Sequence, residues 1–420
     1  MKPFEPMFFT TIKTYTRQQF VKDLVAGIIV AIIALPLSIA LALASGVGPE
    51  EGLYTAIVAG FIISFLGGST VQIAGPTAAF ATIVAGIVAA DGLPGLAVAT
   101  VMAGILLVIM GFCRLGSLIR FIPNTITTGF TAGIAVTIAV GQVKDFCGLL
   151  YPAGTVTIET MDKMKAIIAN FGTVNLWAVL VGVICLAVLI LWPLVPKIGK
   201  RVPGSIVAVL VGILLVKAFR LPVLTIGDLY TVRAGLPKFT MPQFSGSTVL
   251  HMLPDALTIA VLAAIESLLS CVVADQMVGS THRPNTELIA QGLGNIGSAL
   301  FGGIPATGAI ARTAANIKNE GRTPVAGMVH ALTLLLILVV LMPYVSWIPM
   351  PVIAAILFQV AYNMSQWRPF AKICKTGRPL DIVILIVTFV LTVVFNLVAA
   401  IVVGMLIALP GIIKENRAKK

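Results

Sequence analysis

Two ionisable side chains lie inside long apolar stretches, where charges are rare. Glu266 lies within TIAVLAAIESLLSCVVAD (258–275), and Arg312 lies within GGIPATGAIARTAANI (302–317). A charge at the centre of a bilayer costs about 2.5–3.5 kcal/mol on insertion scales, so each must face a cavity or a partner. Ser270 follows Glu266 by four residues and shares its helix face. This carboxylate and hydroxyl predict a site that holds Na⁺ or carries a proton, and the alternative is a structural Glu266–Arg312 ion pair.

Two similar broken segments form the second feature. FLGGSTVQIAGPTAAFATIVAGI (65–87) and LFGGIPATGAIARTAANI (300–317) each leave an apolar run through a Gly-Gly pair, cross extended polar residues, and restart with small residues after Pro76 or Pro305. Proline suits such a break because it lacks an N–H group and favours a helix start. Gln72 precedes the first restart and is a candidate donor to an anion. The alternative is that the glycines only allow close helix packing.

These segments predict an anion site. A helix that starts at the centre of a membrane directs free backbone N–H groups and the positive end of its dipole inward. The second helix has only about nine residues before Lys318, which is about half of a membrane span. Two such helix ends that face each other are suited to hold an anion.

The composition predicts an integral membrane protein. The chain has 420 residues, of which 58% are hydrophobic and 10% are charged, whereas soluble domains carry about 25% charged residues. The net charge of +12 does not indicate nucleic-acid binding, because Lys and Arg gather in short cytoplasmic loops of membrane proteins. Apolar stretches predict fourteen helices, which cover 24–44, 52–66, a third from 76, a fourth from 93, 125–143, 176–195, 205–219, 253–273, 287–301, a short tenth from 308, 324–345, 350–364, 380–396 and 398–413.

The basic residues and the repeat predict the topology. Most of the 28 Lys and Arg residues fall on one side if both termini are cytoplasmic. Each half contains seven predicted helices. Because seven is odd, the second half starts on the opposite side of the membrane from the first, so the two halves are inverted. In inverted repeats, interrupted helices at matching positions indicate a transporter's substrate site. The predicted parts are a cytoplasmic segment (1–23), a first inverted repeat (24–225), a connecting loop (226–252), a second inverted repeat (253–413) and a cytoplasmic tail (414–420).

Four segments resemble the sulfate permease (SulP) family, which is related to the animal solute carrier anion exchangers and prestin. They are IALPLSIALALASGVGPEEGLY (33–54), QIAGPTAAF (72–80), FIPNTITTGFTAGIA (121–135) and GGIPATGAIARTAANI (302–317). The resemblance implies an all-α fold of seven plus seven inverted helices, with helices 1–4 and 8–11 in a core domain and helices 5–7 and 12–14 in a gate domain. Family members continue into a cytoplasmic STAS domain that supports dimer contact. This chain stops at KENRAKK, so no STAS domain is expected in it and a homodimer is an open alternative.

The resemblance also implies the site residues. The family's anion lies between the N-termini of helices 3 and 10, which correspond here to Thr77, Ala78, Ala79, Thr307, Gly308 and Ala309. Arg312 matches the family's arginine on helix 10. Glu266 and Ser270 match the pair that binds Na⁺ in bicarbonate-transporting members, which have Asp and Thr there, and Gly308 is a further Na⁺ candidate.

These observations together predict a function. We expect a secondary active transporter of a small anion (sulfate, bicarbonate or a dicarboxylate), coupled to H⁺ or Na⁺, in a bacterial inner membrane. A nucleobase transporter of the same fold is an alternative, although its site would need carboxylate acceptors where helix 10 has an arginine; an anion channel is another. An enzyme is not expected, because the sequence has no HExxH motif and no Cys/His metal spacing. No cofactor beyond a coupling ion and no nucleic-acid partner is expected.

Overall fold

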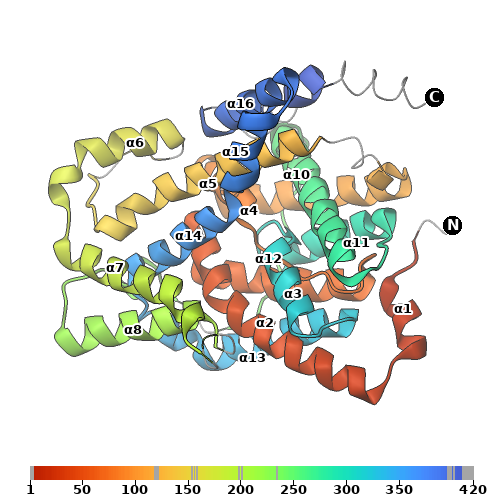
Figure 1. Cartoon of the computed structure of the whole chain (residues 1–420), viewed down its shortest axis with the longest axis horizontal. Coiled ribbons are helices and arrows are strands. Elements are labelled where there is room, and N and C mark those ends of the chain that lie inside the picture. The colour runs from red at the N-terminus through yellow and green to blue at the C-terminus, as the bar shows by residue number, and fades with distance from the viewer. Residues whose placement is uncertain are drawn as a thin grey trace. The chain divides into compact units, whose positions relative to one another are not determined.

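The chain is mostly helical (Figure 1). The computed structural model describes residues 4–117, 123–152, 155, 157, 159–196, 199, 202–232, 235–394, 400 and 403–408. The predicted tail (414–420) and most of the predicted last helix (398–413) lie outside the described residues, as do residues 1–3. Within the described part, seven helices are long and apolar enough to cross a membrane. The predicted total of fourteen spans stays a prediction.

The first half of the chain contains most of the long helices. In order, its elements are α1 (Met7–Thr11), η1 (Ile12–Thr14), α2 (Arg17–Ala44), α3 (Pro49–Leu66), β1 (Ala74–Gly75), α4 (Ala78–Phe112), α5 (Asn124–Cys147), α6 (Thr160–Ala169), η3 (Phe171–Thr173), α7 (Leu176–Leu191), η4 (Trp192–Leu194) and α8 (Gly204–Phe219).

The second half repeats the pattern of a long helix, a break and a restart. Its elements are α9 (Ile226–Leu229), α10 (Gly246–Val278), α11 (Pro284–Leu300), β2 (Thr307–Gly308), α12 (Ile310–Lys318), α13 (Pro324–Val345), α14 (Met350–Met364), α15 (Trp367–Thr376) and α16 (Pro379–Val394).

Two helices begin earlier than their apolar stretches predict. Thr16 caps α2 by accepting a hydrogen bond from the Gln19 N–H at 3.1 Å, and Ser245 caps α10 by accepting one from the Thr248 N–H at 3.1 Å. Such caps stabilise polar first turns, which hydropathy alone does not detect. The segment predicted as a loop at 226–252 therefore contains α9 and the first turns of α10.

The predicted third and fourth helices meet at Gly92. Residues of α4 are helical on both sides of it, but Gly92 itself has a φ of 67° and a ψ of −173°. Only glycine adopts this conformation readily, because it has no Cβ. The boundary predicted near residue 93 is therefore a sharp kink at Gly92 rather than a loop.

The described residues form two compact units. The first comprises Met1–Ser117 and Ala187–Pro349, and the second Leu118–Leu186 and Met350–Lys420. In the first unit α4 packs against α10 and α11, while α13 packs against α2 and α3. Gly104 of α4 and Gly292 of α11 face each other so closely that a side chain on either would collide with the other's carbonyl oxygen. Small residues let helix backbones approach in this way.

The second unit is built around α5, which packs against α14, α16, α6 and α15. The helix predicted at 205–219 is α8, which belongs to the first unit and packs against α2. The short helices α6 and α15 were not predicted, because they are too short and too polar to resemble membrane spans.

Candidate functional site

The two broken segments meet as a short antiparallel sheet. Ala74 of β1 lies opposite Gly308 of β2, and Gly75 lies opposite Thr307. The Ala309 N–H extends the pairing by donating to the Ile73 carbonyl oxygen at 2.8 Å. Extended backbone can lie at membrane depth only if its polar groups are satisfied, and here each break satisfies the other.

The pairing delays both helix starts. We predicted helices from residues 76 and 308, whereas α4 begins at Ala78 and α12 at Ile310, because the preceding residues are extended. Neither helix has a side-chain cap: Thr77 and Ala309 occupy the N-cap positions without a cap hydrogen bond. Their first-turn N–H groups therefore stay available, and the positive ends of both helix dipoles are not neutralised by a cap.

The three predicted helix-10 contact residues, Thr307, Gly308 and Ala309, also have structural roles in the second break. Thr307 is fully buried and its hydroxyl donates to the Ala263 carbonyl oxygen at 3.0 Å. Gly308 lies in β2, and the N–H of Ala309 is bound to Ile73. These three residues hold the break in place, and the N–H groups that α12 presents belong to Ile310 and Ala311.

Gln72 packs into a buried network instead of presenting a free amide. Its Nε2 donates to Glu287 Oε1 at 2.7 Å and to Ser267 Oγ at 3.0 Å. Its Oε1 accepts from Cys271 Sγ at 3.1 Å. Both amide hydrogens are thus committed, so Gln72 joins the first break to α10 and α11 rather than donating to an anion.

Glu287, the first residue of the helix predicted at 287–301, is the centre of that network. Its side chain is 0% exposed and accepts hydrogen bonds from Gly68 N–H at 2.8 Å, Ser267 Oγ at 3.2 Å and Gln291 Nε2 at 2.9 Å, besides that from Gln72. Glu287, Gln291 and Asn295 recur every four residues and are all buried. The four-residue spacing of these three polar residues within a predicted membrane helix is the sequence signal from which the network could have been predicted.

Asparagines satisfy the remaining backbone of the breaks. Asn295 Nδ2 donates to the Ala306 carbonyl oxygen at 2.9 Å, and the Ala306 N–H returns a bond to Asn295 Oδ1 at 2.8 Å. Asn316 Nδ2 donates to the Val71 carbonyl oxygen at 2.9 Å. Buried backbone groups without partners are costly, so these side chains fix the path of both breaks.

Arg312 crosses from the second break to the first. Its side chain is 1% exposed, and Nη2 donates to Ser38 Oγ at 3.1 Å and to the Pro76 carbonyl oxygen at 3.3 Å. The alternative interpretation, an ion pair with Glu266, is not formed, because the Arg312 side chain is directed towards α2. Within the described residues, Nε and Nη1 of Arg312 have no hydrogen-bond partner. Among the described residues, no carboxylate pairs with this charge beside the two helix ends.

Glu266 instead joins α10 to the start of α4. Its Oε2 accepts a hydrogen bond from the Thr77 hydroxyl at 2.9 Å. Ser270 lies one turn further along α10, is 1% exposed, and its hydroxyl has no partner within the described part of the chain. A buried hydroxyl without a partner fits a role in binding a cation or a water molecule. Glu266, Ser270 and Thr77 thus supply oxygen atoms, the ligand type that hard cations prefer.

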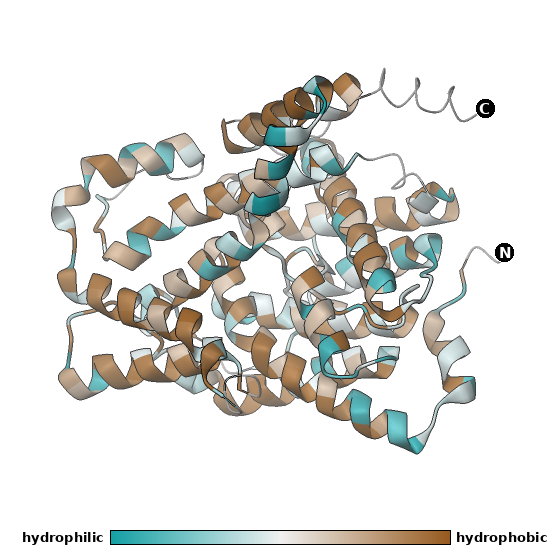
Figure 2. Ribbon diagram, viewed as in Figure 1, coloured by the Kyte–Doolittle hydropathy of each residue, from teal (hydrophilic) through white to brown (hydrophobic). Residues whose placement is uncertain are grey.

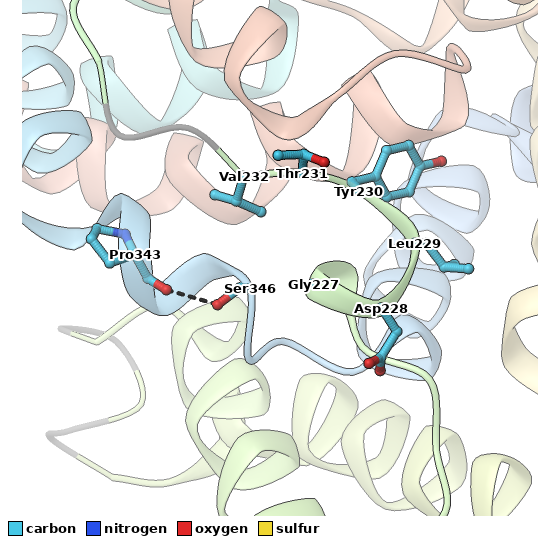
Figure 3. Close-up of a pocket in the computed structure, with 8 residues that line it drawn as sticks. All are labelled: Gly227, Asp228, Leu229, Tyr230, Thr231, Val232, Pro343 and Ser346. Atoms are coloured by element: carbon cyan, nitrogen blue, oxygen red, sulfur yellow. Dashed lines mark hydrogen bonds between the residues drawn. The ribbon is translucent and has the colours of Figure 1, made fainter.

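A separate cavity of about 370 Å³ lies away from these residues (Figure 3). It is lined by α9, the chain that follows it, and the end of α13. The Asp228 carboxylate at its edge already accepts hydrogen bonds from the Thr225 N–H at 2.7 Å and the Thr225 hydroxyl at 2.8 Å. None of the predicted site residues lines this cavity.

Comparisons with known proteins agree with the helical architecture. The model of the sulfate permease family matches residues 20–388. The chain is 43% identical over 407 residues to the putative sulfate transporter YvdB of Bacillus subtilis, which covers 96% of this chain and 75% of that protein. It is 33% identical over 396 residues to the bicarbonate transporter BicA of Picosynechococcus, which covers 92% of this chain and 69% of that protein.

Solved structures show the same fold. The transmembrane domain of a cyanobacterial bicarbonate transporter BicA matches with a TM-score of 0.82 at 30% identity, over 92% of this chain and 98% of that chain. Murine Slc26a9 in the inward-facing state matches with a TM-score of 0.85 at 19% identity, over 97% of this chain and 71% of that chain. The predicted class, an all-α multi-pass membrane protein with this family's transmembrane fold, is confirmed.

Proposed function

Because the chain belongs to the sulfate permease family, a family of transporters, we propose that it is a secondary active transporter of a small anion. Sulfate and bicarbonate are the first candidates, since the names of its relatives contain them, and a dicarboxylate is a third. We place the chain in a bacterial plasma membrane with both termini in the cytoplasm, following its basic residues.

One observation carries this proposal: two uncapped helix ends start from a shared two-stranded sheet, with a buried, carboxylate-free arginine beside them. The first-turn N–H groups of Ala78 and Ala79, and those of Ile310 and Ala311, bind the anion, and Arg312 adds long-range positive charge. Because the donors are backbone groups, they select for charge and size more than for chemical identity.

The coupling ion acts through Thr77. The Thr77 hydroxyl donates to Glu266 at 2.9 Å, and Thr77 is also the N-cap residue of α4. Protonation of Glu266, or Na⁺ bound by Glu266 and Ser270, neutralises the carboxylate that accepts the hydrogen bond from the Thr77 hydroxyl. Ion binding and anion binding thereby influence each other's affinity, as linked sites must. Transport then follows from movement of the core domain against the gate domain.

Uptake of labelled anions by proteoliposomes tests the proposal. We expect saturable uptake of sulfate or bicarbonate that is driven by either a pH gradient or a Na⁺ gradient, each imposed separately. Arg312→Ala and Glu266→Gln are each expected to lower it strongly. Unchanged uptake in the double variant would contradict the site. Competition by uracil but not by either anion would favour the nucleobase alternative, and unsaturable current without cation coupling would favour a channel.

A further inference from the structure

The connection between α14 and α16 contains α15, the helix Trp367–Thr376 with the sequence WRPFAKICKT. Ten residues rise about 15 Å as a helix, which is about half the hydrocarbon thickness. Three of these ten residues are basic and none is acidic. The helix therefore cannot cross the bilayer, and both of its ends continue into helices of apolar sequence, α14 and α16. We expect this connection to hold α15 at the membrane surface.

The two faces of α15 differ in exposure. Phe370, Ala371, Ile373 and Cys374 are half-buried, and the Phe370 ring meets Phe389 of α16 edge-on with 5.4 Å between ring centroids. The apolar face is thus occupied by the protein's own helices. Figure 2 shows the hydrophilic residues of α15 beside the hydrophobic helix α16.

The opposite face carries a basic stripe, which we define as Arg368, Lys372 and Lys375. The spacing of four and three residues places them on one side of the helix, and all three are exposed. Within the part of the chain that the structure describes, none of them forms an ion pair. The Arg368 guanidinium lies 5.3 Å from the Trp367 ring centroid, and Trp367 is itself 49% exposed. Exposed tryptophan beside basic residues is typical of the headgroup region of a bilayer.

We propose that the basic stripe of α15 is a binding site for acidic phospholipids, which it holds by their phosphate groups. Charge complementarity and the position of α15 between two predicted spans (350–364 and 380–396) support a lipid rather than a soluble phosphate. Clusters of basic residues on amphipathic helices attract anionic lipid surfaces, and each residue contributes to the affinity. The competing explanation is that the three side chains are only solvated and follow the general excess of basic residues in cytoplasmic loops.

Native mass spectrometry of the full-length chain, delipidated in detergent and titrated with phosphatidylglycerol or phosphatidylcholine, tests this proposal. We expect preferential binding of phosphatidylglycerol, and roughly 100-fold weaker binding in the variant R368Q/K372Q/K375Q. The binding should also weaken at high salt. A matched control is K13Q/R17Q/K318Q, which removes the same charge from exposed positions outside α15 and should bind phosphatidylglycerol as the unmodified chain does.

Three results would overturn the proposal: equal binding of the two lipids, equal loss in both triple variants, or displacement of the lipid by millimolar inorganic phosphate. The last would indicate a site for free phosphate instead. Lipid binding is measured without any transported anion, so its failure is distinguishable from a failure of the proposed transport function.

The depth of Trp367 supplies an independent measurement. The chain has four tryptophans, and a variant that keeps only Trp367, with Phe at positions 177, 192 and 347, reports on α15 alone. In phosphatidylglycerol vesicles we expect its fluorescence to be quenched by lipids brominated near the carbonyl groups. Quenching by aqueous iodide and not by brominated lipid would place α15 in water and would contradict a lipid site.

Discussion

The two breaks are built alike, yet each depends on the other in a different way. Arg312, which follows β2, lies against Gly75 of β1, while Gln72, which precedes β1, lies against Gly308 of β2. A glycine at each position therefore receives a side chain from the opposite break. The difference is in what holds those side chains. Gln72 is fixed by Glu287, Ser267 and Cys271, whereas among the residues that the structure describes the guanidinium of Arg312 bonds to Ser38 and Pro76 alone.

Because of this difference, we expect the first break to matter most for stability and the second for anion binding. The first break is anchored by a buried network in which the Glu287 carboxylate accepts four hydrogen bonds, and these bonds contribute to folding. The second break supplies a buried cation whose N–H groups are only partly satisfied, and such groups are typical of functional sites. Substitutions on the two sides should therefore change different measured quantities.

The largest effect is expected from Glu287→Ala. It leaves four buried donors without their acceptor, and unsatisfied buried donors cost about 1–3 kcal/mol each. We expect the free energy of unfolding in detergent to fall by more than about 3 kcal/mol, with little folded protein recovered. Glu287→Gln, which keeps the shape and one acceptor oxygen, should recover part of that loss. Equal stability of both variants and the unmodified chain would show that the network is not an anchor.

Gly308→Ala should have the next largest effect, on stability. The new methyl group would displace the Gln72 amide, which cannot move without breaking its bonds to Glu287 and Ser267. Overpacking of this kind costs about 1–3 kcal/mol, which thermal unfolding in detergent would detect. A double variant with Gln72→Ala makes room for the methyl group, so the two changes should be less than additive. Full additivity would contradict the contact.

The two breaks are predictable from the sequence because the residues that indicate them lie within the broken segments themselves. Paired glycines, prolines and an isolated Arg312 are visible without knowing which helices are neighbours. The partner of Arg312 was not visible. Glu266 was the nearest candidate by charge, but the partners are a serine on α2 and the carbonyl oxygen of Pro76. Partners depend on helix packing, which the spacing of residues within one helix does not specify.

The same limit explains the missed elements and Glu287. An acidic residue in the first turn of a helix is common, because it complements the helix dipole. Its position alone therefore gives no reason to predict a buried network at Glu287. The helices α6 and α15 lack the long apolar stretch that identifies a span. Most apolar stretches do lie in helices, because hydrophobic length is visible in the sequence, whereas the starts of α2 and α10 depend on caps in polar sequence.

Gly75→Ala should change transport and leave stability nearly unaffected. Its methyl group would displace the Nη1 end of Arg312, and the far end of a flexible side chain moves at low cost. Nη2, which makes the bonds to Ser38 and the Pro76 carbonyl oxygen, is not the atom that the methyl group meets, so these bonds are kept while the charge shifts relative to the helix ends. We expect the KM for anion uptake to rise about tenfold, which corresponds to about 1.4 kcal/mol, with an unchanged melting temperature. A stability loss as large as that of Gly308→Ala would remove the distinction between the two breaks.

Thr77→Val should give the smallest effect and the most specific one. It keeps the shape of the side chain but removes the hydroxyl that donates to Glu266 at 2.9 Å. A hydrogen bond to a charged group contributes about 1.5–3 kcal/mol, of which only the part that differs between coupled states affects transport. We expect the H⁺ or Na⁺ concentration that gives half-maximal uptake to change about two- to five-fold. The KM for the anion at a saturating concentration of the coupling ion should stay the same. Thr77→Ser keeps the hydroxyl and should behave as the unmodified chain does. If Thr77→Val raised KM as Gly75→Ala does and left the ion dependence unchanged, Thr77 would belong to the anion contact alone and not to the coupling of the two sites.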